Sequence, residues 1–185
     1  MAGRPRRIDR DRVLDAAEAV VTRMGAARLT IDAVARAAGV TKGGVQYCFG
    51  TKENLIRAMI ARWSDAFDAE VAGLAGPDPS ARATIRAHLE ATRADDETDH
   101  SRSAAMMTAL LEAPDQVAAS RDWYDARIAP LDLADPADRK AAIAFLACEG
   151  AFLLRSFGLM GLDEAQWNSL FGEMLAMASD PPARK

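Results

Sequence analysis

Hydrophobic residues recur at helical spacing along most of the chain. One stripe follows positions Val13, Ala17, Val20 and Met24, and a longer one runs from Leu55 to Val71. No stretch shows the sustained alternation of apolar and polar positions that is typical of a half-buried strand. The pattern therefore predicts an all-α fold.

Capping residues and glycines divide this pattern into about nine helices. Asp9, Thr30 and Thr41 each stand directly before a periodic segment, where their side chains can accept from free backbone N–H groups. Gly25 and Gly39 close the first two segments. The predicted helices run from Asp9 to Gly25 and then cover about 31–38, 42–48, 52–71, 80–96, 101–113, 114–128, 136–159 and 163–178.

The helices predicted at 31–38 and 42–48 are very short, and a turn that contains Gly39 separates them. This is the layout of a helix-turn-helix motif. Small side chains such as Ala35 and Ala38 allow the two helices to cross closely. A unit this small lets its last helix protrude far enough to enter the major groove of double-stranded DNA.

The residues expected to contact DNA lie on helix 42–48 or close to its ends. Gly43 and Gly44 would let the backbone approach DNA, Gln46 can pair with an adenine edge, and Tyr47 can donate its hydroxyl to a phosphate. The full predicted set on this motif is Thr30, Thr41, Lys42, Gly43, Gly44, Gln46, Tyr47 and Lys52.

The charge distribution agrees with a DNA-binding N-terminal region. Residues 1–62 carry 12 Lys and Arg against 6 Asp and Glu, whereas the remaining residues carry 11 against 21. At the basic end, Arg4, Arg6 and Arg7 form an arm that can enter a minor groove. The alternative is a tail that contributes only non-specific charge.

The stretch RDRVLDAAEAVVTRMGAARLTIDAVARAAGVTKGGVQYCFGTKENLIRAM resembles the DNA-binding region of the tetracycline-repressor (TetR) family. The resemblance rests on residues in the same order and spacing: the Ala-Ala pair of the first helix, Gly25, Thr30, Val34-Ala35, Ala38-Gly39-Val40-Thr41, Gly43, Tyr47, Phe49, Lys52-Glu53 and Leu55. It implies a DNA-binding head at 1–51 and a helical ligand-binding and dimerisation domain at 52–185.

The sequence departs from the family pattern at two positions. An aromatic residue is usual at the position of Gln46, and Ser or Thr is often found at that of Gly44. The base preference therefore cannot be carried over from relatives. The alternative reading of the head is a three-helix packing module that makes no DNA contact.

The last two predicted helices are candidates for a dimer interface, which is also where the resemblance places one. Helix 163–178 is amphipathic, and the segment 141–154 is apolar on nearly every side, so it must be covered on every side. The alternative is a central helix of a monomeric bundle. The predicted interface residues are Leu146, Gly150, Leu153, Phe157, Trp167, Leu170, Phe171 and Met174.

A small-molecule pocket is expected among the middle helices because of the family resemblance; from the residues alone, ordinary core is the simpler reading. Methionine adapts its shape to varied apolar ligands. His88, Glu149 and Arg155 are possible polar partners, although surface or interface positions suit them as well. The predicted lining is Met106, Met107, Leu110, Trp123, Tyr124, Phe145, Cys148 and Phe152.

Other classes of protein have little support in the sequence. His88 and His100 have no second metal ligand at helical spacing, and no nucleophile elbow or phosphate-binding glycine loop occurs, so no enzyme, metal or cofactor is expected. The longest apolar run, 141–148, is far shorter than the roughly twenty residues of a membrane span. The two cysteines, Cys48 and Cys148, suit a reducing cytoplasm.

Together these patterns favour a homodimeric transcriptional repressor that binds a near-palindromic operator and releases it when a small, apolar effector binds. The alternative is a DNA-binding regulator without such an effector, acting as an activator or answering a protein partner. An enzyme built on a helical bundle ranks third.

Overall fold

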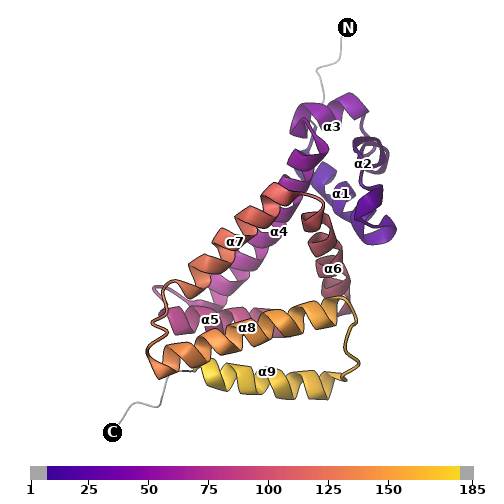
Figure 1. Ribbon diagram of the computed structural model, residues 1–185. Helices are drawn as coiled ribbons and strands as arrows, with labels where there is room; N and C mark the ends of the chain where they lie inside the picture. Colours follow the sequence, from indigo (N-terminus) through magenta and orange to yellow (C-terminus); the bar gives the residue numbers. More distant parts are fainter. Residues whose placement is uncertain (1–7, 180–185) are drawn as a thin grey trace. The chain divides into compact units, whose positions relative to one another are not determined.

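The structure is a computed structural model that describes residues 8–179 (Figure 1). Within this range the chain forms nine α-helices, one short 3₁₀ helix and no strand, which confirms the all-α prediction. The elements are α1 (Arg10–Met24), η1 (Ala26–Arg28), α2 (Ile31–Ala38), α3 (Lys42–Phe49), α4 (Lys52–Ala75), α5 (Ala81–Ala94), α6 (Glu97–Leu111), α7 (Pro114–Ile128), α8 (Pro136–Ser156) and α9 (Glu164–Ala178).

The predicted N-caps are confirmed. The Asp9 carboxylate accepts from the backbone N–H groups of Asp11 and Arg12, and the Thr30 and Thr41 hydroxyls each accept from the N–H group three residues on. These bonds satisfy N–H groups that have no partner inside the helix. Gly39 ends α2 with φ at 66°, a conformation that glycine adopts without strain.

Two helix ends differ from the prediction for local reasons. Helix α6 begins at Glu97 rather than near Ser101, because the Asp96 carboxylate accepts from the N–H groups of Thr98 and Asp99 and caps the helix earlier. Helix α8 ends at Ser156 rather than Leu159, because Gly158 takes a left-handed conformation with φ at 61°.

The described chain divides into two compact units. The first, called the head here, comprises residues 8–63 and 105–117, and the second, called the body, comprises 64–104 and 118–179. The predicted boundary after residue 51 differs from this division. The head extends further because apolar residues of α4, among them Leu55 and Met59, pack into the same core as α1 to α3.

The head core is built from small and medium-sized apolar side chains. Val13 and Ala17 of α1 pack with Val34 of α2 and Val45 of α3, and all four are buried. The narrow α1 and α2 side chains let these helices cross closely, as the sequence predicted. The core therefore fixes α3 from one side and leaves its other side to solvent.

The body core lies among α5, α8 and α9, and α8 runs alongside α9 (Figure 1). Ile85 and Leu89 of α5 meet Phe145 of α8 and Phe171 of α9, and these side chains are almost fully buried. Burying side chains of this size stabilises a fold by about 1.5–3 kcal/mol each.

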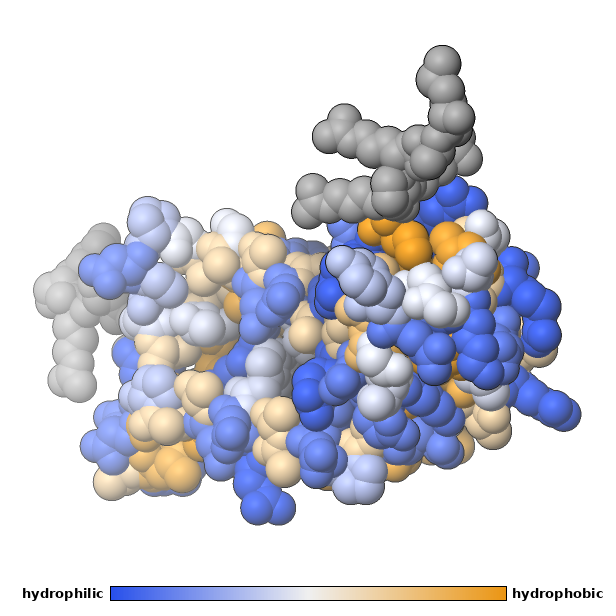
Figure 2. Space-filling view, turned by 90° about the horizontal axis from the view of Figure 1, so that it is seen from above, coloured by the Kyte–Doolittle hydropathy of each residue, from blue (hydrophilic) through white to orange (hydrophobic). Residues whose placement is uncertain are grey.

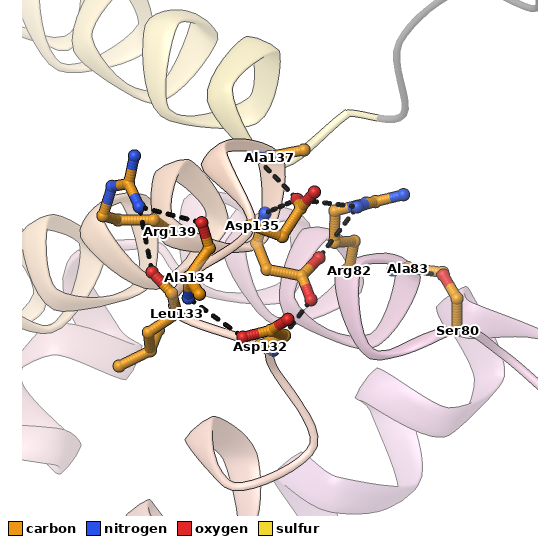
Figure 3. Close-up of polar contacts among 10 residues, drawn as sticks. Ser80, Arg82, Ala83, Asp132, Leu133, Ala134, Asp135, Ala137 and Arg139 are labelled. Carbon is orange, nitrogen blue, oxygen red and sulfur yellow. Dashed lines mark hydrogen bonds and ion pairs between the residues drawn. The ribbon is translucent and has the colours of Figure 1, made fainter.

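A network of charged residues ties the start of α8 to α5 (Figure 3). The Arg82 Nη1 atom lies 2.8 Å from the Asp138 carboxylate, whose other oxygen accepts from the Asp132 N–H at 2.9 Å. The Asp135 side chain caps α8, as predicted, and Pro136 takes its first position. Arg139 donates to the carbonyls of the preceding loop.

The surface is mostly hydrophilic, with hydrophobic patches between polar residues on the face that Figure 2 shows. Scattered apolar residues of this kind are normal on protein surfaces. Within residues 8–179, no helix combines the length and the hydrophobicity that a bilayer crossing requires.

Candidate functional site

Helix α3 has one buried and one exposed face. Val45 and Phe49 point into the head core, whereas Gln46 and Tyr47 are exposed, and 90% of the Tyr47 surface is accessible. A tyrosine this exposed contributes nothing to the core. The exposed face of α3 therefore carries groups that can bind a partner: an amide, a phenol and the open backbone at Gly43.

The residues predicted at the start of α3 have local structural roles as well. The hydroxyls of Thr30 and Thr41 are engaged as helix caps. The Lys42 ammonium lies 3.1 Å from the Asp32 carboxylate in an exposed ion pair. Exposed pairs contribute little to stability, so Lys42 can exchange this partner for a phosphate at small cost.

Gly44 has a different role from the one expected. It is buried, and a Cβ atom at this position would lie 2.5 Å from the Cδ1 atom of Ile8. Its missing side chain makes room for Ile8 rather than for DNA. Gly43 differs, because a Cβ atom there would meet nothing within 4 Å. Of the two glycines, only Gly43 remains a candidate for close approach to DNA.

Lys52 and the N-terminal arm complete the predicted DNA-binding set. The Lys52 ammonium lies 3.9 Å from the Glu112 carboxylate and is partly buried, so it is less available to a phosphate than Lys42. Arg10, which the sequence analysis did not select, lies over the Phe49 ring and donates to the Cys48 carbonyl at 2.5 Å. The predicted arm, Arg4, Arg6 and Arg7, lies outside the described residues.

The predicted pocket residues are divided between the two units. Met106, Met107 and Leu110 pack in the head core. Trp123, Tyr124, Phe145, Cys148 and Phe152 belong to the body. Periodicity alone could not reveal this division, because 105–117 is far in sequence from the rest of the head.

Three polar side chains of the body, of which His88 is buried and Tyr124 and Glu149 are partly buried, form a network centred on Glu149. One carboxylate oxygen lies 2.7 Å from Nε2 of His88, and the other accepts from the Tyr124 hydroxyl at 2.8 Å. Burial and the neighbouring Glu149 carboxylate raise the pKa of Tyr124, which keeps its proton for this bond. His88 is only 2% exposed, so the expectation that it lies at a surface was wrong.

A second polar group lies beside this network. The Trp123 Nε1–H donates to both oxygens of Asp68 at 3.2 Å, and Asp68 also pairs with Arg127, whose guanidinium lies over the Trp123 ring. Asp68 and Arg127 line a groove of about 270 Å³ together with Val71, Ala72, Ala75, Pro79, Ala81, Thr84, Ala126 and Pro130. Sequence reasoning missed Asp68, since nothing in its own neighbourhood distinguishes it.

Cys148 is buried in the body core, and burial raises the pKa of its thiol to about 12. A thiol with so high a pKa is not a nucleophile at neutral pH. This position is packed between apolar neighbours of α5 and α8.

The predicted dimer face stays a prediction, but two of its residues are not exposed on it. Trp167 and Phe171 are buried in the core of their own subunit, where the Arg155 guanidinium lies near both rings, so neither is available to a partner. The other predicted interface residues form an exposed stripe on α8 and α9. Ile143 of α8, which was not predicted, belongs to the same stripe. The exposed or half-buried members are Ile143, Leu146, Gly150, Leu153, Phe157, Leu170 and Met174.

Comparison with protein families decides what kind of molecule carries these features. A model described as bacterial regulatory proteins, tetR family, matches residues 13–59. A second, described as tetracyclin repressor-like, C-terminal domain, matches residues 82–179, which is more than half of the chain. The chain belongs to the TetR family of transcriptional regulators.

Solved structures of other proteins share the fold. A transcriptional regulator from Rhodococcus sp. Rha1 matches with 18% identity over 92% of this chain and 96% of that chain, at a TM-score of 0.71. The fatty acid degradation regulator FadR from Bacillus halodurans matches with 15% identity over 90% and 98%, at a TM-score of 0.64. The multidrug binding protein EbrR, in complex with malachite green, matches with 24% identity over 92% and 98%, at a TM-score of 0.66. A comparison with curated protein sequences gave no match.

TetR regulators are DNA-binding transcription factors rather than enzymes, and they typically act as dimers and bind small molecules. The helix-turn-helix formed by α2 and α3 lies within residues 13–59, the part of the chain that the first of these family models matches.

Proposed function

We propose that this TetR regulator is a homodimeric repressor that binds a near-palindromic operator and releases it when a small molecule binds the body. The observation that carries the proposal is the exposed face of α3, where Gln46 and Tyr47 face solvent on a helix whose other side is fixed in the head core. Gln46 reads base edges, while Tyr47 and Lys42 contact phosphates.

The exposed stripe on α8 and α9 supports the dimer. Leu146 is 66% exposed, and Ile143, Leu153 and Phe157 lie on the same face of α8. A partner subunit that covers this stripe removes it from water, and Gly150 allows the helices to approach closely. Two recognition helices held about 34–36 Å apart fit successive major grooves on one side of DNA.

Two observations support a small-molecule effector. The partly buried polar network of the body supports it, because local departures from an apolar core occur where they serve function. EbrR, a multidrug binding protein, has the same fold, which supports a body that accepts small molecules. Binding there shifts the dimer towards a spacing that no longer matches the operator.

Footprinting tests the repressor proposal. The protein is incubated with the DNA upstream of its own coding region, with and without a panel of apolar compounds. A protected near-palindrome that one compound releases supports the proposal. Stable protection with every compound, together with release by a protein partner, would instead support a regulator without a small-molecule effector.

Charge placed on the stripe tests the dimer. We expect Leu146→Glu to yield a monomer in analytical ultracentrifugation and to weaken operator binding by about tenfold or more, since each half-site then binds alone. Leu74→Glu is the matched control, because Leu74 is an exposed leucine of α4. A dimeric Leu146→Glu protein with unchanged operator affinity would contradict the proposed interface.

A further inference from the structure

Helix α3 has little helical stability of its own. It has eight residues, and two of them are glycines, which are poor helix formers. Isolated helices this short are marginal in water, so contacts with the rest of the head must hold α3 in place. Val45 and Phe49 supply the buried part of these contacts. The two ends of the helix need further partners.

The last turn of α3 receives one such partner from α1. The last carbonyl groups of a helix have no partner inside it. The Gln46 carbonyl accepts from the backbone N–H of Gly50 at 2.7 Å, whereas the Cys48 carbonyl accepts from Nη1 of Arg10 at 2.5 Å. The last turn has no basic side chain of its own, so Arg10 supplies the positive charge that the helix dipole favours at this end.

A second contact fixes the orientation of the Arg10 side chain. Its guanidinium carbon lies 4.5 Å from the centre of the Phe49 ring, and Phe49 is itself 6% exposed in the head core. Arg10 is exposed, and exposed charge contacts contribute little to stability. The main effect of the two contacts is therefore on where the end of α3 lies.

Three consecutive residues at the start of α1 connect this helix to both ends of α3. Ile8 occupies the space that Gly44 leaves at the start of α3, and Arg10 bonds to its last turn. Between them, the Asp9 carboxylate caps α1. Because the cap fixes the path of the chain here, Ile8 and Arg10 are held at set positions relative to α1.

We propose that Arg10 is a positioning residue for DNA recognition. Together with Ile8 it holds α3 at both ends, so that Gln46 and Tyr47, which lie between the two contacts along the helix, face the operator in one orientation. Hydrogen bonds to base edges weaken steeply when their angles change, so a tilted α3 loses discrimination between sequences. This inference rests on the proposed reading of the operator by α3 and names a residue outside α3 on which that reading depends.

A direct bond from Arg10 to a phosphate is the alternative role. Phosphate contacts carry no sequence information, so losing one weakens binding to all sequences alike and lowers the salt dependence of binding. Losing a positioning residue instead weakens binding to the operator more than binding to other DNA. Discrimination between sequences therefore separates the two roles.

Amide hydrogen exchange of the full-length protein tests the contacts of Arg10 without DNA. Arg10→Met removes the charge and the donors but keeps a long side chain. We expect the Gly50 amide, which closes α3, to exchange at least about tenfold faster, whereas the Gly25 amide, which closes α1, keeps its rate. An unchanged Gly50 rate in this variant overturns the inference.

Arg23→Met is the matched control for both experiments. Arg23 is an exposed arginine of α1 that donates to a carbonyl of its own helix, so the substitution removes the same charge from the head without touching α3. It should leave the Gly50 exchange rate and DNA binding within about twofold of the wild type. A control that behaves like Arg10→Met would assign the effect to net charge and overturn the inference.

DNA binding tests the consequence for recognition. The probes are the duplex protected in the footprinting experiment and a duplex of the same length and composition in scrambled order. We expect Arg10→Met to weaken binding to the protected duplex by about tenfold, to change binding to the scrambled one by less than about threefold, and to leave the salt slope unchanged. Equal weakening on both duplexes, with a salt slope lower by about one, would assign Arg10 to a phosphate and overturn the inference.

A double substitution separates this inference from the proposed function. If Arg10 acts through α3, the loss of operator affinity caused by Gln46→Ala should be at least about threefold smaller in the Arg10→Met background. The same loss in both backgrounds would leave the proposed reading by Gln46 intact and contradict the role of Arg10. If Gln46→Ala has no effect by itself, the reading by Gln46 fails, and the exchange rates and the discrimination between duplexes decide on Arg10.

Discussion

The head and the body bury different kinds of side chain. Every buried side chain of the described head is apolar, whereas His88, Thr92 and Ser103, the buried polar or charged side chains of the described chain, all belong to the body. The head therefore resembles a solid apolar support, with its polar groups on the outside. The body contains hydrogen-bonding groups where apolar side chains would give greater stability.

This difference fits the two roles proposed for the head and the body. A surface that reads DNA works best when its shape is fixed, and close apolar packing fixes shape. Burying polar groups costs stability unless each one is paired. The Thr92 hydroxyl donates to the His88 carbonyl, whereas one ring nitrogen of His88 has no hydrogen-bond partner among the described residues. Substitutions in the two units test this contrast between an apolar head core and a partly polar body core.

Removing volume from the head core should have the largest effect. Met59 is fully buried in this core, so Met59→Ala should lower the free energy of unfolding by about 2–5 kcal/mol. Met24 is 59% exposed at the end of α1, and Met24→Ala should change it by less than about 0.5 kcal/mol. Urea unfolding followed by circular dichroism gives both values. Similar losses in the two variants would mean that the head core is loosely packed.

The two tyrosines of the chain provide a direct comparison of head and body. Tyr124→Phe removes the donor to Glu149, so it should lower the free energy of unfolding by about 1–3 kcal/mol. Tyr47→Phe should leave stability unchanged and weaken binding to all DNA sequences alike, because its hydroxyl is exposed. Calorimetry and fluorescence anisotropy measure the two effects. The contrast between head and body fails if both variants lose stability equally.

Asp95 in the body should make stability depend on pH. Burial and the charges of Asp99 and Glu70 raise its pKa from 3.8 to about 6. Between about pH 4 and 6 the Asp95 carboxyl of the folded protein therefore holds its proton more tightly than that of the unfolded chain does. The free energy of unfolding falls as the pH rises through this range. Asp95→Asn should weaken this decline and raise the free energy of unfolding at pH 7.5 by about 1–2 kcal/mol. If Asp95→Asn and the wild type gave the same unfolding curves across this pH range, the raised pKa of Asp95 would be excluded.

Substitutions of the two glycines at the start of α3 should show the smallest effects, and the two should differ. Gly43→Ala fills open space and should stabilise the head by about 0.5–1 kcal/mol, because alanine is the better helix former. Gly44→Ala should give no such gain, since its Cβ displaces Ile8. Thermal unfolding distinguishes them. Equal stabilisation by both substitutions would show that Ile8 does not pack against α3.

Local features of the fold were predictable from the sequence because they depend on neighbouring residues. The caps at Asp9, Thr30 and Thr41 act within three residues, and the glycine at position 39 fixes a turn by its own conformation. The layout of α2 and α3 follows from such signals together with a stripe of apolar residues. The exposed positions of Gln46 and Tyr47 follow from the same periodicity.

Contacts between distant segments were not predictable in the same way. The sequence around Met106 does not indicate whether this residue lines a pocket or packs in a core, and the structure shows that it packs in the head core. Trp167 and Phe171 share the apolar stripe of α9, and periodicity cannot tell which members face their own subunit. His88 and Glu149 are 61 positions apart, so nothing local signals their hydrogen bond.

The packing of Ile8 against Gly44 has a practical consequence for the handling of this protein. Ile8 lies against the start of the recognition helix. A purification tag or fluorescent label joined directly before Ile8 would thus lie close to the surface proposed to read the operator. Affinities measured with such a fusion would include steric and charge effects of the tag. A C-terminal fusion, or a cleavable tag removed before the assay, avoids this source of error.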